Sequence, residues 1–368
     1  MPTPPDGLEN RLFRHWFSDR PVLNGIQRLL LWAAAQMYRA LLWGRELWRR
    51  RVSPPRRLTG VTVVAIGNLI VGGAGKTPCA IALASAMRDA GIRCGLITRG
   101  YRSEAEHGPC RVVDPSELSS LTASQIGDEA WLLAWRTQLP IAVGKNRFEG
   151  AQRLKERYPD LQAVLLDDGL QQRSLHCDQR LLVLDERGFG NGACLPLGPL
   201  REPIGNLQRF DGWIDHGFRD SPGFQSVAHA LPRTYARLSQ TNHAWVPIAQ
   251  WATPSSWLNL HEGVMRFKNL RLLAVAGIAV PARFFETLTG LGLAVDTLGL
   301  NDHDPNTVAY VQRRWATKAY DAVLMTEKDA VKFFHQDSVL DIPAWALRRD
   351  AILDEDFLTR FVHGLKTA

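Results

Sequence analysis

The residues best able to do chemistry lie in a glycine-rich turn in the first quarter of the chain. An apolar run over 61–66 is typical of a buried strand, the turn Gly72-Gly73-Ala74-Gly75 follows, and Lys76 and Thr77 come just before a helical pattern over 80–90. This order is typical of a P-loop, in which backbone N–H groups bind phosphate, the lysine neutralises the β- and γ-phosphates and the hydroxyl holds Mg²⁺. The turn therefore predicts a site for a nucleoside triphosphate.

One position of this motif departs from the usual spacing. A glycine normally stands six residues before the lysine, where this chain has Ile70. A glycine-rich turn that binds no ligand is the alternative, but the strand before the turn and the helix after it favour a P-loop. The residues expected to bind nucleotide are Ile70, Val71, Gly72, Gly73, Ala74, Gly75, Lys76 and Thr77.

Two adjacent carboxylates end another predicted strand. Asp167 and Asp168 follow an apolar run over 163–166. The carboxyl ends of parallel strands meet at one edge of a sheet, so these acids could hold Mg²⁺ or a water beside the P-loop. A plain acidic turn is the alternative, and the P-loop upstream favours the functional interpretation.

Further charged residues could bind a phosphate or a metal. A glycine- and proline-rich loop over 187–203 is expected to shape a pocket, where Glu202 could reach a metal and Arg201 a phosphate. Arg99, after another predicted strand, and Arg147 are two more candidates for binding phosphate. A surface position is the alternative for each single arginine.

An aspartate and a histidine far apart in the sequence could form an acid–base pair. Asp128 lies in Gly127-Asp128-Glu129, which opens a helical pattern, and acids in a first turn also simply complement the helix dipole. His303 lies in a polar loop between Asp302 and Asp304, where a solvated histidine is the simpler interpretation. An Asp/His pair could nevertheless activate a hydroxyl as a general base.

The composition is that of a globular protein with room for two domains. The 368 residues are 45% hydrophobic and 22% charged. The five cysteines are odd in number and show no C-x-x-C spacing, which argues against a disulfide framework or a zinc site and is typical of a reducing cytosol. The chain opens without a signal-peptide pattern.

The positive charge is concentrated at the N-terminus. Residues 1–57 contain eleven arginines and four acids, an excess equal to the whole net charge of +7. On a helix over 26–50, apolar and charged side chains take opposite faces, and the longest uncharged run, over 29–38, is too short for a bilayer, which needs about 20 residues. These features favour an amphipathic helix in a membrane interface over nucleic-acid binding, and a helix docked on the globular body is the alternative.

Strand and helix patterns alternate after a proline-containing break at 53–57. This alternation predicts an α/β fold, a P-loop kinase-like mostly parallel sheet with a second, smaller α/β domain. The expected organisation is a basic membrane-associating arm over 1–52, a P-loop domain over 57–265 and a C-terminal domain over 266–368. No regular pattern is evident over 204–263. The predicted strands are 61–66, 93–98, 140–144, 162–166, 180–184, 272–276, 294–298 and 322–325, and the helices are 80–90, 127–138, 146–158, 282–291 and 307–317.

Together these motifs resemble the tetraacyldisaccharide 4′-kinase family of lipid A biosynthesis. The resemblance covers about residues 20–333, and the family's P-loop also lacks the first glycine. The motifs that carry it are Gly67-Asn68-Leu69, Gly72 to Pro78, Arg99-Gly100-Tyr101, Gly127-Asp128-Glu129, Asp167 to Gln171, Arg187 to Gly192, Leu195 to Pro203, Asp302-His303 and Thr326 to Lys332. The chain departs from the family at Gln172, where histidine is common, and at Ala130, where proline is usual.

The resemblance implies transfer of the γ-phosphoryl group of ATP, with Mg²⁺, to the 4′-hydroxyl of a tetraacyl glucosamine disaccharide 1-phosphate. It also implies a peripheral enzyme at the cytoplasmic face of a Gram-negative inner membrane, with a monomer compatible with that activity. Asp128 would be the base and His303 its orienting partner, and Asp168 would help bind the nucleotide. The implied metal ligands are Thr77, Asp167 and Glu202, and the implied phosphate or substrate ligands are Asn68, Arg99, Arg147 and Arg201.

A membrane-recruited P-loop ATPase that acts as a switch is the alternative function. It would explain the P-loop and the basic helix equally well. It would leave Asp128, His303 and the pocket loop without a role.

Overall fold

The computed structural model describes residues 8–18, 22–221, 223–334 and 342–366. Parts of the predicted arm (1–7 and 19–21) and of the predicted C-terminal domain (335–341 and 367–368) lie outside the described residues. The described chain has the predicted α/β fold, with a long, mostly parallel sheet whose strands follow the order β11-β10-β12-β13-β8-β7-β6-β1-β5-β2-β4-β3.

The strand before the P-loop is the central one of its part of the sheet. β1 (Thr62–Gly67) pairs in parallel with β5 (Ala163–Leu166) and with β6 (Gln179–Asp185). Its alternate side chains enter two different cores, one under α3 and α5 and the other under α6, so both faces of the strand are covered. The other strands here are β2 (Cys94–Thr98), β3 (Arg111–Val113), β4 (Ile141–Val143) and β7 (Gly212–His216), and the helices are α3 (Lys76–Asp89), α4 (Ala123–Ile126), α5 (Asp128–Thr137), α6 (Arg147–Arg157) and α7 (Phe224–Val227).

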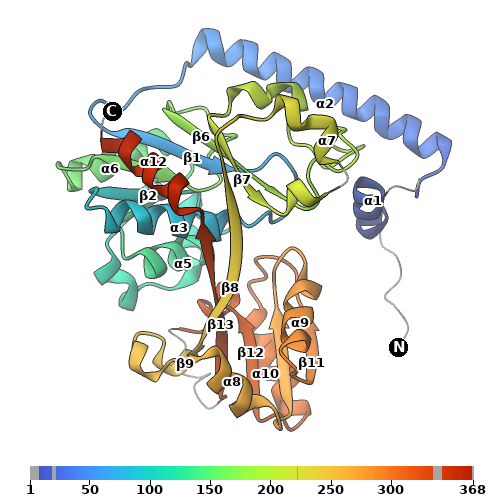
Figure 1. Ribbon diagram of the computed structural model, residues 1–368, viewed down its shortest axis with the longest axis vertical. Coiled ribbons are helices and arrows are strands. Elements are labelled where there is room, and N and C mark those ends of the chain that lie inside the picture. Colours follow the sequence, from blue (N-terminus) through green and yellow to red (C-terminus); the bar gives the residue numbers. More distant parts are fainter. Residues whose placement is uncertain (1–7, 19–21, 222, 335–341, 367–368) are drawn as a thin grey trace.

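A second group of parallel strands forms the lower part of the molecule in Figure 1. Two long strands join the parts: β8 (Tyr235–Pro247) pairs in parallel with β7 at its start and antiparallel with β13 (Ala344–Leu353) beyond it. The other elements of this part are β9 (Leu258–Asn259), β10 (Leu272–Ala276), β11 (Val295–Gly299), β12 (Ala322–Thr326), α8 (Leu260–Phe267), α9 (Pro281–Gly290), α10 (Thr307–Thr317) and α11 (Glu327–Ala330).

The predicted strands and helices are present with ends shifted by a few residues. The unpredicted elements include β7 and β8, in the segment that shows no pattern, β13 and α12 (Glu355–Lys366), and the shorter β3, β9, α4, α7, α8 and α11. Both joining strands interrupt their apolar residues with charged or polar ones, as in Arg348-Arg349-Asp350, so neither shows the usual strand signal. Helix α12 returns to contact α3. The domain boundaries stay a prediction, since β8 and β13 connect the two parts of the sheet.

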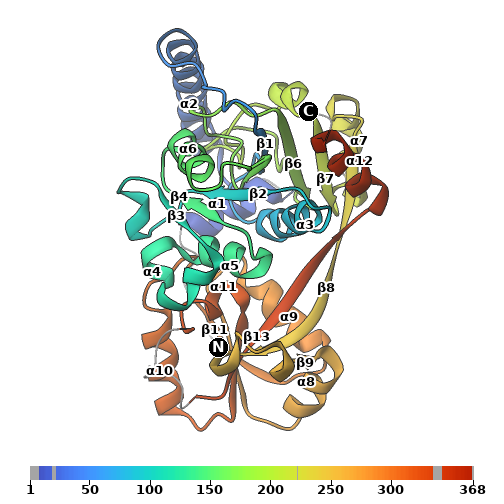
Figure 2. The same ribbon diagram turned by 90° about the vertical axis from the view of Figure 1, so that its left-hand side faces the viewer.

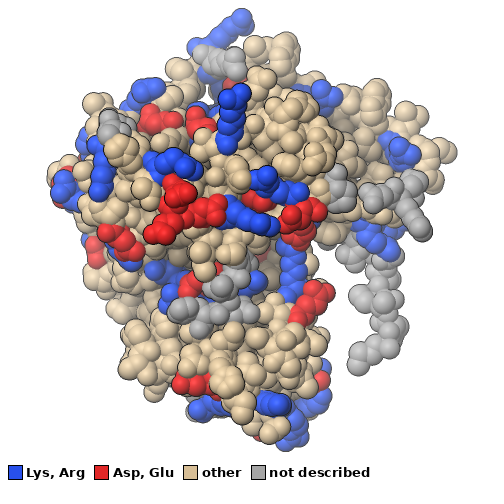
Figure 3. Space-filling view, in the orientation of Figure 1, with Lys and Arg blue, Asp and Glu red and all other residues tan. Residues whose placement is uncertain are grey.

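The N-terminal arm consists of α1 (Leu8–Phe17) and the long helix α2 (Gly25–Val52), whose end projects beyond the body (Figure 2). The arm docks partly: Ala35 is buried, Tyr38 packs against the core, and the Tyr38 hydroxyl donates to the carbonyl of Arg201 at 3.0 Å. Uncharged side chains dominate the α2 surface visible in Figure 3. The large apolar side chains that α2 leaves exposed are Ile26, Leu29, Leu30, Trp32, Met37, Leu41, Trp43, Trp48 and Val52. Among the described residues no helix has the length and apolarity to cross a bilayer.

Candidate active site

The candidate site is a cavity of about 1520 Å³ between the two parts of the sheet. Its lining includes the segments that follow β1, β2 and β5 on one side and β10, β11 and β12 on the other. Both sets of parallel strands therefore direct their carboxyl ends toward one space, where ligands of parallel α/β sheets bind. Residues of α2 border the same cavity: Tyr38, Arg45, Trp48 and Arg49.

The glycine turn has the conformation of a phosphate cradle. Gly72 and Gly75 have φ values of 94° and 83°, a left-handed region that favours glycine. Helix α3 begins at Lys76 with no side-chain hydrogen bond capping it, so the N–H groups of its first turn remain for a ligand. Within the predicted set, Val71, Gly72, Gly73, Gly75, Lys76 and Thr77 line the cavity.

Ile70 and Ala74 are not among the cavity-lining residues. The side chain of Ile70 is only 2% exposed, and its backbone forms an isolated antiparallel bridge with Leu200. The neighbouring Val71 N–H donates to the carbonyl of Pro199 at 3.0 Å. Ile70 thus anchors the P-loop to the glycine- and proline-rich loop, which is a structural reason for an apolar residue at the position where glycine is usual.

Two carboxylates lie beside the P-loop lysine. Nζ of Lys76 lies 2.8 Å from Oδ1 of Asp168, and Nη1 of Arg201 lies 3.4 Å from Oδ2. Desolvation opposes ionisation of Asp168, but these two positive charges outweigh it and lower the pKa of that carboxyl. Asp167 is 3% exposed, and burial, reinforced by the charge of Glu129, raises the pKa of its carboxyl to about 7. The pair therefore combines one ionised carboxylate with one whose pKa lies close to neutral pH.

The other predicted phosphate ligands surround this group at different depths. Asn68 is fully buried, and its Oδ1 accepts from Nζ of Lys76 at 3.2 Å, so it positions the lysine from behind. Arg147 is 5% exposed and lines the cavity, and burial lowers the pKa of its guanidinium to about 10. Arg99 is half exposed at the cavity rim, where its Nε lies 2.7 Å from Oε1 of Glu106.

Glu202 does not join the carboxylates. It is absent from the cavity lining, and its buried carboxylate is ion-paired with Arg209 and lies 3.7 Å from Arg173. Arg209 and Arg173 therefore hold the Glu202 side chain away from the P-loop. The adjacent Arg201, in contrast, lines the cavity. Within the described ranges, no cluster of three or more histidine, cysteine or acidic residues has the arrangement of a metal site.

Asp128 and His303, separated by 175 residues, are in contact. Nδ1 of His303 lies 2.9 Å from Oδ1 of Asp128, and the two side chains are 12% and 7% exposed. Burial opposes ionisation of Asp128, but the hydrogen bond with His303 and the charge of Lys328 outweigh it and lower the pKa of that carboxyl. The ring of Tyr101 packs edge-on against the imidazole at 5.3 Å. Asp128 is therefore more than a helix start, and His303 is not a solvated histidine.

Several site residues have no role in the sequence-based interpretation. Lys328 contacts His303, Glu129 and Asp302, and Arg187 donates from Nη2 to the carbonyl of Gly73 in the P-loop. Lys328 follows directly after β12, so the rule that identified Asp167 and Asp168 as strand-end residues could also have identified it.

This arrangement defines a class of protein. A P-loop on the central strand of a parallel sheet, carboxylates at the end of the neighbouring strand and an Asp–His pair whose histidine lines the same cavity are the parts of a P-loop phosphotransferase. The particular family follows from sequence: a model of the tetraacyldisaccharide-1-P 4′-kinase family matches residues 27–366, and the chain belongs to this family.

Individual relatives agree with the family match. Proteins named tetraacyldisaccharide 4′-kinase are 32% identical in Herminiimonas arsenicoxydans, over 98% of each chain, and 36% identical in Dechloromonas aromatica (strain RCB), over 88% of this chain and 89% of that one. The crystal structure of LpxK from Aquifex aeolicus in complex with ATP has a TM-score of 0.70, covers 92% of this chain and 99% of its own, and is 21% identical, which is a likeness of fold.

Proposed function

We propose that this protein transfers the γ-phosphoryl group of ATP, with Mg²⁺, to the 4′-hydroxyl of a tetraacyl glucosamine disaccharide 1-phosphate. The reaction is the one named for its relatives. The observation that carries the proposal is the single cavity that joins the lysine of the P-loop, Lys76, to His303 of the Asp–His pair. A phosphoryl donor and a hydroxyl acceptor must share one space for in-line transfer.

The residues present fit a nucleotide with its metal. Among the described residues no side chain caps the first turn of α3, and a Cβ built at Gly73 would meet only Ala279, at 3.9 Å, so the backbone there is open to a phosphate. Thr77 and the buried Asp167 would hold Mg²⁺, since hydroxyl and carboxylate oxygens suit a hard cation. When bound, Mg²⁺ supplies neutralisation of the charge that develops on the phosphate oxygens.

Side chains of the protein neutralise charge, accept the proton and bind the phosphates. Lys76, Arg201 and Arg147 supply positive charge around the transferred group. Asp128 accepts the proton of the acceptor hydroxyl, whose oxygen forms the new bond to the γ-phosphorus as the bond to the bridging oxygen breaks and ADP leaves. His303 holds the carboxylate in position. Asp168, which lies beside Lys76, would help to bind the nucleotide. Arg99 binds phosphate at the rim.

The lipid acceptor is proposed to enter from the side of α2. Arg45 and Arg49 contribute positive charge to the cavity there, and Trp48 is both part of the lining and 59% exposed. The exposed apolar side chains of α2 would sit among acyl chains and headgroups, in the way of an interfacial helix rather than a spanning one. This placement corresponds to a peripheral enzyme at the cytoplasmic face of the inner membrane.

Transfer of label from γ-³²P-ATP tests the proposal. With the tetraacyl disaccharide 1-phosphate in mixed micelles, label should appear in the lipid, and an acceptor that lacks the 4′-hydroxyl should receive none. Release of label only as inorganic phosphate, at a rate that does not depend on the acceptor, would overturn the kinase assignment in favour of an ATPase switch.

A further inference from the structure

The ammonium of Lys328 has three neighbours that accept hydrogen bonds. Nζ lies 2.9 Å from Oε1 of Glu129, 2.9 Å from Oδ1 of Asp302 and 3.0 Å from Nε2 of His303. An ammonium has three protons and no lone pair, so three acceptors use its whole capacity. The side chain is 16% exposed. Desolvation acts against its charge, but the carboxylates of Glu129, Asp128 and Asp302 outweigh this and raise the pKa of Lys328.

This contact determines which nitrogen of His303 carries the proton. Because Lys328 can only donate, Nε2 must present its lone pair, and a neutral imidazole then carries its hydrogen on Nδ1. That hydrogen points to Oδ1 of Asp128, 2.9 Å away. Both imidazole nitrogens are therefore occupied, and His303 has no free site for a substrate proton. The other carboxylate oxygen, Oδ2 of Asp128, is buried and has no hydrogen-bond partner among the described residues.

The residues directly before and after Lys328 each form a hydrogen bond to another element of the fold. Oε1 of the preceding residue, Glu327, lies 2.5 Å from Nη1 of Arg136, which belongs to the same helix as Asp128. The following residue, Asp329, is fully buried and accepts from the backbone N–H of Gly277 at 2.9 Å. Helix α11 is thus fastened to α5 and to the segment after β10, so the position of the Lys328 ammonium is set by the backbone.

We propose that Lys328 is a positioning residue of the phosphoryl-transfer site, which keeps His303 neutral with its proton on Nδ1 and leaves Oδ2 of Asp128 as the sole proton acceptor of the pair. This inference rests on the proposed function, because it assigns the state of the same Asp–His pair. It also gives the roles of the two residues a physical reason: the imidazole orients, and the carboxylate accepts.

Lys328 should therefore determine how kcat varies with pH. With a cation at Nε2, a second proton on His303 is repelled and has no lone pair to occupy. Without Lys328, the imidazole can protonate beside Glu129 and Asp302, and an imidazolium in contact with Asp128 makes that carboxylate a poorer base. The charged and titratable groups around this pair are Asp128 and Glu129 from α5, Asp302 after β11, Tyr101 and Arg102 after β2, and Lys332 after α11.

Histidine tautomers in the unmodified protein provide the first test. In the full chain with ¹⁵N-labelled histidine, Nε2 of His303, assigned with His303→Asn, should show the shift of an unprotonated nitrogen and Nδ1 that of a protonated one. A proton on Nε2 in the wild type would overturn the inference without reference to any variant.

Kinetics provide the second test. Lys328→Met should lower kcat about tenfold at pH 7, with partial recovery at higher pH, while KM for ATP changes little. Lys328→Arg keeps a cationic donor and should retain the wild-type pH profile. Lys318→Met removes an ammonium that is 53% exposed just after α10 and outside the cavity lining, and it is the matched control, with an expected wild-type profile.

The outcomes separate this inference from the proposed function. A wild-type pH profile for Lys328→Met, with Asp128→Asn inactive, would overturn the role of Lys328 alone. Full label transfer by Asp128→Asn would overturn the assignment of Asp128 as the base, and with it the role of Lys328, while the kinase assignment would stand.

Discussion

The lysine of the P-loop is paired with an acid: Nζ of Lys76 lies 2.8 Å from Oδ1 of Asp168. The side chain is 15% exposed and also contacts Oδ1 of Asn68 at 3.2 Å. Its ammonium is therefore pre-positioned at the floor of the cavity, so little side-chain entropy remains to be lost when a phosphate binds.

Replacing Lys76 by methionine should remove this pre-positioned charge. We expect kcat/KM for ATP to fall by about 100-fold or more, because a group directed at the developing phosphate charge contributes on that scale. Steady-state kinetics measure the loss. Lys155→Met removes the same charge from α6, outside the cavity lining, and should leave kcat/KM within about twofold of the wild-type value. Equal effects of the two changes would contradict a specific role for Lys76.

Asp128→Asn tests the proton acceptor. An amide keeps the size of the side chain but cannot take a proton, so kcat should fall by about 100-fold or more while the Kd for ATP stays within about threefold. Single-turnover label transfer and nucleotide titration separate the two quantities. Asp89→Asn, on a side chain 65% exposed at the end of α3, is the matched control. An unchanged kcat for Asp128→Asn would reduce Asp128 to a helix start.

The raised pKa of Asp167 predicts proton release on metal binding. Burial raises the pKa of this carboxyl from 3.8 to about 7, so at pH 6 the folded protein holds a proton that a cation would displace. Binding of ATP with Mg²⁺ at pH 6, measured by calorimetry in buffers of different ionisation enthalpy, should release up to about one proton from this group. Asp167→Asn should lose that component, and release unchanged by the substitution would assign the proton elsewhere.

The same shift has a consequence for stability, with a defined sign. Between pH 3.8 and about 7 the folded ligand-free protein binds a proton at Asp167 that the unfolded chain has released. The contribution of this group to the free energy of unfolding is therefore complete below that window and is lost as the pH rises through it. Urea unfolding at pH 5 and pH 8 should show a smaller difference in Asp167→Asn than in the wild type.

The exposed apolar side chains of α2 should control membrane binding. Changing Leu29, Leu30, Met37 and Leu41 together to glutamine should lower partition onto anionic vesicles about tenfold or more, because each buried apolar side chain contributes to binding. Sedimentation with vesicles measures the effect. Met265→Gln with Ile352→Gln, at 60% and 51% exposure outside the arm, is the matched control. Unchanged partition of the α2 variant would favour a helix that only docks on the body.

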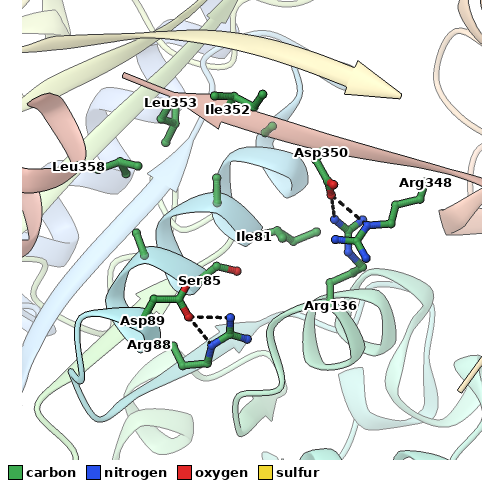
Figure 4. A pocket seen from close by; sticks show the side chains of 13 residues that line it. Ile81, Ser85, Arg88, Asp89, Arg136, Arg348, Asp350, Ile352, Leu353 and Leu358 are labelled. Atoms are coloured by element: carbon green, nitrogen blue, oxygen red, sulfur yellow. Dashed lines mark hydrogen bonds and ion pairs between the residues drawn. The ribbon is translucent and has the colours of Figure 1, made fainter. Parts of the chain in front are cut away.

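A second cavity, between α3 and β13, allows two ion pairs to be compared (Figure 4). Arg136 from α5 is buried with Glu327 and Asp350, while Arg88 from α3 is 40% exposed and pairs with Asp89. Arg136→Met should lower the free energy of unfolding by about 3 kcal/mol, because Glu327 would stay buried without its cation. Arg88→Met should cost about 1 kcal/mol or less, since exposed pairs contribute little. Urea unfolding measures both, and similar losses would contradict this difference.

The sequence predicts those features that depend on neighbours along the chain. The strands and helices around the P-loop were predictable because their periodicity, glycines and strand-end acids lie within a few residues of one another. The joining strands β8 and β13 were not, because they alternate poorly and pair with each other over about a hundred residues. The position of Glu202 could not be predicted from the sequence either. Its ion partners Arg209 and Arg173 come together with it only in the folded protein, while Arg201 lines the cavity.

By itself, the sequence determined the P-loop, the Asp167–Asp168 pair and the apolar and basic character of α2, since each depends on residue types at short spacing. The family resemblance implied that His303 partners Asp128, but only the tertiary structure decided that their side chains are in contact and that Lys328 occupies the other imidazole nitrogen. The physical reason lies in the antiparallel pairing of β8 with β13, which joins the two groups of parallel strands. In that arrangement their carboxyl ends line one cavity, a relationship that no local pattern in the chain encodes.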